Sequence, residues 1–121
     1  MTAGDSARVA LACIRLANGT AALLAPEAFA RRLGLDPETD RSALYALRLF
    51  GVRTVLIGAQ LLGRDGESRE RAVRVAPLVH AADTLAAAIA GAAGQLPARG
   101  ARKAVAVSSV NTVLALLARR S

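Results

Sequence analysis

Aromatic residues are scarce in this chain of 121 residues, which has two phenylalanines, one tyrosine and no tryptophan. Proteins that bind single-stranded nucleic acid usually stack the bases on aromatic side chains, which this chain can hardly supply. The formal net charge of +7 comes from basic residues dispersed among short breaks and chain ends, not gathered in one patch. We therefore expect no nucleic-acid partner, and we attribute the charge to loops that face anionic lipid headgroups.

Cysteine and histidine occur once each, as Cys13 and His80. A single thiol allows no disulfide framework and no thiolate metal site, and we expect Cys13 to be a small buried side chain. The sequence also lacks the GxSxG and HExxH motifs and a phosphate-binding glycine loop. Its first residues lack the basic, apolar and cleavage regions of a removable signal peptide. We expect no metal, no cofactor, and a first hydrophobic segment that is retained.

Alanine, leucine and valine supply most of an apolar content of 54%, and the mean hydropathy is +0.37. These residues favour helices over a β-sandwich or barrel. They form contiguous blocks separated by charged breaks with glycine and proline, a pattern typical of membrane spans. The sequence predicts one all-α domain, a four-helix transmembrane bundle in the cell membrane, with lipids around it. The expected spans cover about residues 7–25, 43–63, 72–95 and 102–118.

The break after the first span carries the signals of a short helix. Pro26 suits a first helical position, Phe29 and Leu33 are four residues apart, and Gly34 is a stop signal. We expect one or two amphipathic turns along the membrane surface, with a plain solvated loop as the alternative.

Other helix ends are also marked in the sequence. We expect an N-cap at Asp5 or Ser6 for the first helix, and at Asp40 or Ser42 for the second span. The charged, turn-rich segment before Arg71 cannot be a span, so we expect the third helix to begin near that residue.

One polar residue lies nearest the centre of each hydrophobic segment: Arg15, Arg53, Asp83 and Asn111, in chain order. A midpoint is unchanged when a helix is reversed, so these four residues share one level whichever way the bundle is inserted. Charged residues inside a membrane are costly and are kept when they are paired or used. We expect Asp83, the only acid in the third span, to pair with Arg15 or Arg53.

Arginines outnumber acids in this interior, because the second segment also contains Arg48. One interpretation is that Asp83 neutralises one arginine while neighbouring amides and His80 satisfy the others, so that the layer only fixes helix packing. The other is an internal pocket for an amphiphilic, acidic or carbonyl-bearing molecule, with proton transfer available. The candidates for the polar core or ligand site are Arg15, Asn18, Arg48, Arg53, Gln60 and Asn111, with His80 and Asp83 as candidate catalytic residues.

Gly51 and Gly58 are seven residues apart in the second segment and form a strip of small residues. Such a strip lets another helix approach closely. We expect these glycines to serve helix packing, with a ligand-facing role as the alternative.

Short motifs rich in arginine and glycine are spread along most of the chain: Arg15-Leu16-x-x-Gly19, Arg32-Leu33-Gly34-Leu35-Asp36, Arg48-Leu49-Phe50-Gly51-x-Arg53, Gly58 and Ala82-Asp83. Together they resemble small four-helix integral membrane proteins of actinobacteria that are loosely DoxX-like and have no known function. The resemblance implies a multi-pass membrane protein and supplies no activity. His80 stands near the place where that family often has a second acid, which argues against a two-carboxylate mechanism.

Three further functions stay open at the level of sequence. A small proton-coupled exporter would act as a homodimer and use Asp83 to exchange protons. An isomerase or cyclase would use His80 and Asp83 as acid and base, whereas a structural membrane subunit would use neither. A soluble helical bundle is the remaining alternative, since no span is free of charge for much more than fifteen residues.

Overall fold

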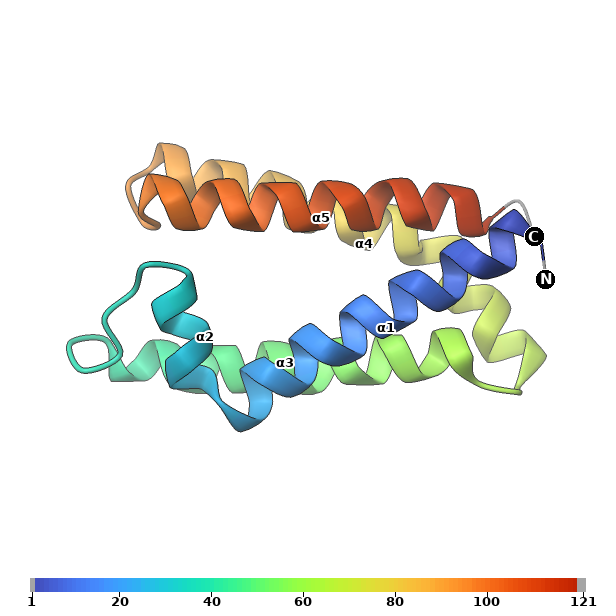
Figure 1. The fold of residues 1–121 in the computed structure, drawn as a ribbon, viewed down its shortest axis with the longest axis horizontal. Helices are drawn as coiled ribbons and strands as arrows, with labels where there is room; N and C mark the ends of the chain where they lie inside the picture. The colour runs from blue at the N-terminus through green and yellow to red at the C-terminus, as the bar shows by residue number, and fades with distance from the viewer. Residues whose placement is uncertain (1, 120–121) are drawn as a thin grey trace.

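The computed structural model describes residues 2–119, and within that range the chain forms helices and no strand (Figure 1). The helices are α1 (Ala3–Leu24), α2 (Pro26–Arg32), α3 (Arg41–Leu62), α4 (Gly66–Ala92) and α5 (Ala98–Ala118). The four long helices are each long and apolar enough to cross a membrane. The all-α prediction and the short helix after the first long one are therefore confirmed.

The observed caps confirm one expectation and correct another. The Asp40 carboxylate accepts a hydrogen bond from the Ala43 backbone N–H at 3.3 Å, as expected for an N-cap of α3. For α1 the cap is Thr2, not Asp5 or Ser6. Its hydroxyl accepts a hydrogen bond from the Asp5 N–H at 3.0 Å, and the Asp5 carboxylate accepts one from the Thr2 backbone N–H at 3.3 Å. This reciprocal capping box places Asp5 inside the first turn.

Helix α4 begins at Gly66, about one turn before the expected start. The Asp65 carboxylate accepts hydrogen bonds from the backbone N–H groups of Glu67 and Ser68 at 3.2 and 3.5 Å. Asp65 therefore starts the helix ahead of the charged residues, which continue it as a polar turn instead of forming a loop. At its other end α4 stops at Ala92, and Gly94 adopts a positive φ of 75° that ends the helical path.

The long helices form two antiparallel pairs, α1 with α3 and α4 with α5 (Figure 1). Helix α1 also packs on α5 and so joins the pairs, whereas α3 and α4 contact each other far less. The pairs lie close together at the end where α1 begins and diverge toward the opposite end. Helix α2 lies between them at that wider end (Figure 1).

Glycines allow the close approach of α1 and α3. A Cβ atom on Gly51 would lie 2.6 Å from both the Gly19 carbonyl oxygen and the Leu23 nitrogen. A Cβ on Gly58 would lie 2.9 Å from the Leu16 side chain. The strip of small residues in the second long helix therefore serves helix packing, as expected, with Gly19 as its counterpart on α1.

The buried apolar residues are mostly small and many large ones are exposed, the reverse of the distribution in a water-soluble bundle. Ten of the thirteen buried apolar residues among those described are alanines, while leucines such as Leu56, Leu78 and Leu85 are 60 to 74% exposed. Exposed apolar surface of this extent is unfavourable in water, whereas small residues inside and large ones outside suit helices packed in lipid. Cys13 is exposed, so the expectation of a buried thiol was wrong. The fold is that of a multi-pass membrane protein.

Candidate ligand-binding site

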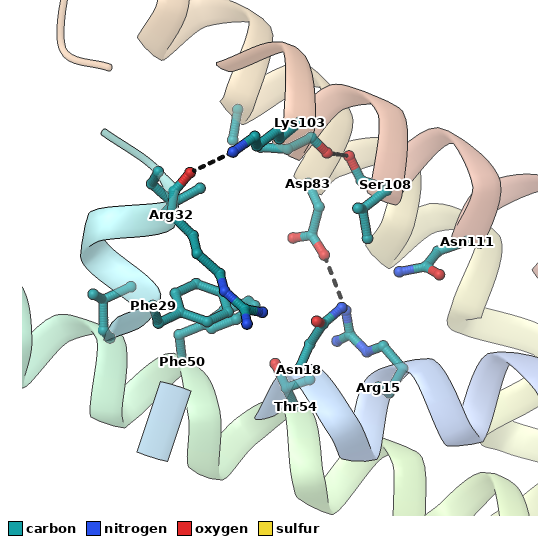
Figure 2. A pocket seen from close by; sticks show the side chains of 15 residues that line it. Arg15, Asn18, Phe29, Arg32, Phe50, Thr54, Asp83, Lys103, Ser108 and Asn111 are labelled. Atoms are coloured by element: carbon teal, nitrogen blue, oxygen red, sulfur yellow. Dashed lines mark hydrogen bonds and ion pairs between the residues drawn. The ribbon is translucent and has the colours of Figure 1, made fainter. Parts of the chain in front are cut away.

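A cavity of about 420 Å³ lies between the two helix pairs, on the side where they diverge (Figure 2). Every helix contributes to its wall. The lining consists of Arg15 and Asn18 of α1, Phe29 and Arg32 of α2, Leu33 directly after it, Leu47, Phe50 and Thr54 of α3, Asp83 and Ala86 of α4, and Lys103, Ala104, Val107, Ser108 and Asn111 of α5.

Asp83 joins two arginines from different helices. One carboxylate oxygen lies 3.3 Å from the Arg15 Nη1 atom, and the other lies 3.8 Å from the Arg53 Nη2 atom. Arg15 is 3% exposed, whereas Arg53 is 59% exposed on the outer side of α3. The expected pairing of Asp83 with Arg15 or Arg53 is therefore confirmed, and the acid contacts both. Three of the four residues predicted at mid-depth meet here, and Asn111 lines the same cavity.

His80 lies one turn before Asp83 on α4 and is fully buried. Its Nδ1 atom is 3.4 Å from the Arg15 Nη1 atom and 3.9 Å from an Asp83 oxygen. Because an arginine N–H can only donate, Nδ1 must accept, and the neutral ring then carries its proton on Nε2. His80 is not among the residues that line the cavity. Its contact is with Arg15, which does line the cavity.

Several buried polar atoms beside the cavity have no hydrogen-bond partner within residues 2–119. They are the Nε and Nη2 atoms of Arg15, the Thr54 Oγ1 atom and the Asn111 Oδ1 atom. A buried polar group without a partner costs roughly 1–3 kcal/mol, so such groups are rare away from functional sites. Asn18 is half-buried on the same wall (Figure 2). The inner end of the cavity is thus polar and incompletely satisfied.

Arg48 and Gln60 do not belong to this polar centre, contrary to expectation. Both are exposed, and neither lines the cavity. Arg48 donates a hydrogen bond from Nη1 to the Leu23 carbonyl oxygen at 2.6 Å, which satisfies one of the last carbonyls of α1. The buried stripe of α3, from Leu44 to Leu61, packs on α1, and at about 100° per residue Gln60 falls on the opposite side.

Two basic and two aromatic residues of the site were not predicted from the sequence. Arg32 and Lys103 line the wider end of the cavity, where the Lys103 ammonium donates to the Arg32 backbone carbonyl at 3.1 Å. The Phe29 and Phe50 rings lie 6.2 Å apart between centroids and form part of the apolar wall. Gly100 is the sequence signal that could have indicated this contact. Because it has no Cβ, α5 can approach the Leu33 backbone.

No group of three or more histidine, cysteine, aspartate or glutamate side chains within residues 2–119 is placed to hold a metal ion. Comparisons with protein families, curated proteins and solved structures find no match for the chain. What the site does must therefore be argued from its own chemistry. It offers an apolar wall, a buried polar end, and a surplus of positive charge.

Proposed function

We propose that this multi-pass chain lies in the cell membrane and binds a small lipophilic molecule with an acidic or carbonyl group in the cavity. The main support is one observation: buried polar atoms that have no partner among the described residues lie beside an apolar wall in a single cavity of about 420 Å³. Ligand pockets typically measure about 300–1,000 Å³ and combine apolar walls with a few convergent polar groups.

The charge of the lining favours an acidic or carbonyl oxygen over a cation. Arg15, Arg32 and Lys103 face the cavity against one acid, Asp83, a formal excess of two positive charges. A proton-coupled exporter of cations needs a free carboxylate, yet Asp83 has guanidinium nitrogens at 3.3 and 3.8 Å. We therefore favour binding of an electron-rich molecule.

We place the entrance to the cavity between α3 and α4, which contact each other over a short stretch only. Leu47 and Phe50 stand on one side of this opening and Ala86 on the other. A molecule dissolved in the lipid would reach the polar end by this route without crossing water.

A fluorescent acid tests the proposal directly. The protein in phosphatidylcholine nanodiscs is titrated with 11-(dansylamino)undecanoic acid, with empty nanodiscs as the background. We expect a saturable rise in dansyl emission that decanoic acid reverses. Ala86→Phe fills the cavity and should abolish this signal, whereas Ala82→Phe, one turn earlier on α4 and outside the lining, should preserve it. Emission equal to that of empty nanodiscs, or equal binding by both variants, would contradict the proposal.

A purely structural membrane subunit is the second candidate, because Asp83 of α4 contacts arginines of both α1 and α3. This role predicts no saturable binding of the dansyl probe. Membership of the loosely DoxX-like group of actinobacterial membrane proteins is a separate proposal. It rests on the arginine and glycine motifs and adds no activity.

A further inference from the structure

The cavity has two polar ends of different character. Lys103 and Asn111 mark these ends on α5, and eight residues of helix separate their backbones by about 12 Å. The outer end, toward α2, carries cationic side chains. The inner end carries neutral amide and hydroxyl groups together with the Arg15–Asp83 pair.

Arg32 and Lys103 have no acidic partner among residues 2–119. The Lys103 ammonium donates once, to the Arg32 carbonyl, and keeps two N–H groups for another acceptor. The Arg32 side chain runs past the phenylalanine rings toward the cavity (Figure 2). A guanidinium and an ammonium at one end of the cavity form a site for an anionic headgroup.

The wall between the two ends is apolar in effect. Phe29 and Phe50 form one side, and Val107 contributes from α5. Ser108 is also present, but its hydroxyl donates to the Ala104 carbonyl at 2.5 Å. Its donor is thereby used within its own helix, so this stretch suits a hydrocarbon chain.

At the inner end, Thr54 and Asn111 each present a buried oxygen without a partner in the described part of the chain. Both residues are at least 97% buried, since Asn111 is 3% exposed and Thr54 is 0% exposed. A hydroxyl group on a ligand can donate to either oxygen. A simple alkyl end would leave both unsatisfied.

We propose that the ligand is an amphiphilic anion with a second oxygen function at its far end. Arg32 and Lys103 bind the acid group, the aromatic wall holds the chain, and a distal hydroxyl donates a hydrogen bond to the Thr54 or the Asn111 oxygen. This inference rests on the proposed binding function, and it makes a hydroxylated lipophilic acid the preferred class. A carboxylate and a phosphate monoester share the anionic chemistry of the head.

Four ten-carbon competitors separate the two ends: decanoic acid, 10-hydroxydecanoic acid and the methyl ester of each. They displace the dansyl probe from the full chain in nanodiscs, and decyl phosphate serves as a fifth competitor that compares the two kinds of head. We expect the acids to bind about tenfold more tightly than their esters, because charge-assisted hydrogen bonds are stronger than neutral ones. The hydroxy acid should also bind more tightly than decanoic acid.

Variants assign each preference to its end of the cavity. Arg32→Gln and Lys103→Gln should each remove most of the preference for acid over ester. The control variants Arg31→Gln and Arg99→Gln, which change neighbouring residues outside the lining, should keep this preference. Thr54→Val, which keeps the side-chain shape, and Asn111→Leu should each remove the preference for the hydroxy acid over decanoic acid, measured as the ratio of their affinities for one variant. Thr54→Val keeps this test available should Asn111→Leu fail to fold.

Equal binding of acids and esters, or equal effects of the Arg32 and Arg31 variants, would overturn the anionic headgroup but not the binding function. Equal binding of decanoic and hydroxydecanoic acid would overturn the distal hydroxyl. Failure of every competitor and of the dansyl probe would overturn the binding function itself, and this inference with it.

Discussion

The oxygens of the Asp83 carboxylate face different arginines, and the two arginines have different surroundings. Arg15 is enclosed by protein, whereas Arg53 is largely exposed and reaches Asp83 from the outer side of α3. His80 adds a ring nitrogen to the buried arginine. The acid therefore holds three helices at one point, and its loss affects more than one pair.

Asp83→Asn should destabilise the protein by about 3–5 kcal/mol, because it removes the charge of the carboxylate that contacts the buried Arg15 guanidinium. Arg53→Ala should cost less, since Asp83 keeps its contact with Arg15. The double variant should cost no more than Asp83→Asn alone, as expected for residues that act as a unit. Unfolding by SDS in mixed micelles measures all three variants, and a fully additive result would contradict a shared ion pair.

His80→Gln should lower stability and leave binding of the dansyl probe unchanged. The glutamine amide oxygen can replace Nδ1 as an acceptor for Arg15, and His80 does not line the cavity. Thermal unfolding and probe titration on the same sample give both results. A large loss of probe affinity in a folded variant would place His80 in contact with the ligand and revive an acid–base role.

At the scale of helices, α1 and α3 pack through backbone contacts at glycine, and this interface tolerates no added atom. Gly51→Ala would place a Cβ 2.6 Å from backbone atoms of Gly19 and Leu23, which cannot move aside as a side chain can. We expect a loss of about 1–3 kcal/mol, the usual cost of overpacking. Gly66→Ala is the control, because no atom lies within 4 Å of its added Cβ. Equal unfolding curves for the two variants would contradict close packing at Gly51.

The sequence predicted the helices well because their signals are local. Long apolar blocks, Pro26 and Gly34 at the ends of the short helix, and Asp40 before α3 all act within a few residues. The start of α4 was misplaced because a charged segment after a glycine has the composition of a turn. The Asp65 side chain caps this charged segment, and with that cap the segment forms the first turn of α4.

The candidate site was harder to predict, because it depends on how each helix is rotated. Depth along a helix follows from counting residues, so Arg15, Arg53 and Asp83 were correctly brought together. The rotation of a helix about its own axis depends on the helix it packs on. The packing of α3 on α1 turns Arg48 and Gln60 away from the cavity. Arg32 and Lys103 meet across 71 residues of sequence, through a contact that no local pattern encodes.

For the whole molecule, the inverted distribution of residue size predicts how its single cysteine reacts. Cys13 is exposed and lies near the middle of α1, so in a membrane it should face hydrocarbon. We expect a water-soluble maleimide to leave it unlabelled in intact membranes and to label it after denaturation with SDS. Glu67→Cys in a Cys13→Ala background places a thiol at the exposed, polar start of α4 and should be labelled without SDS once both membrane faces are accessible. Equal labelling of both proteins would indicate a water-soluble bundle.

The central position of α1 has a consequence for biosynthesis. Helix α1 packs on both α3 and α5, yet of these five helices it leaves the ribosome first and α5 last. The first pair can assemble around its glycines as soon as α3 is inserted, with Arg15 and Arg53 already on it. Their acid arrives only with α4. During synthesis the half-made protein therefore carries Arg15 and Arg53 in the membrane before Asp83 is present. Their positive charge attracts the Asp83 carboxylate and so favours insertion of α4.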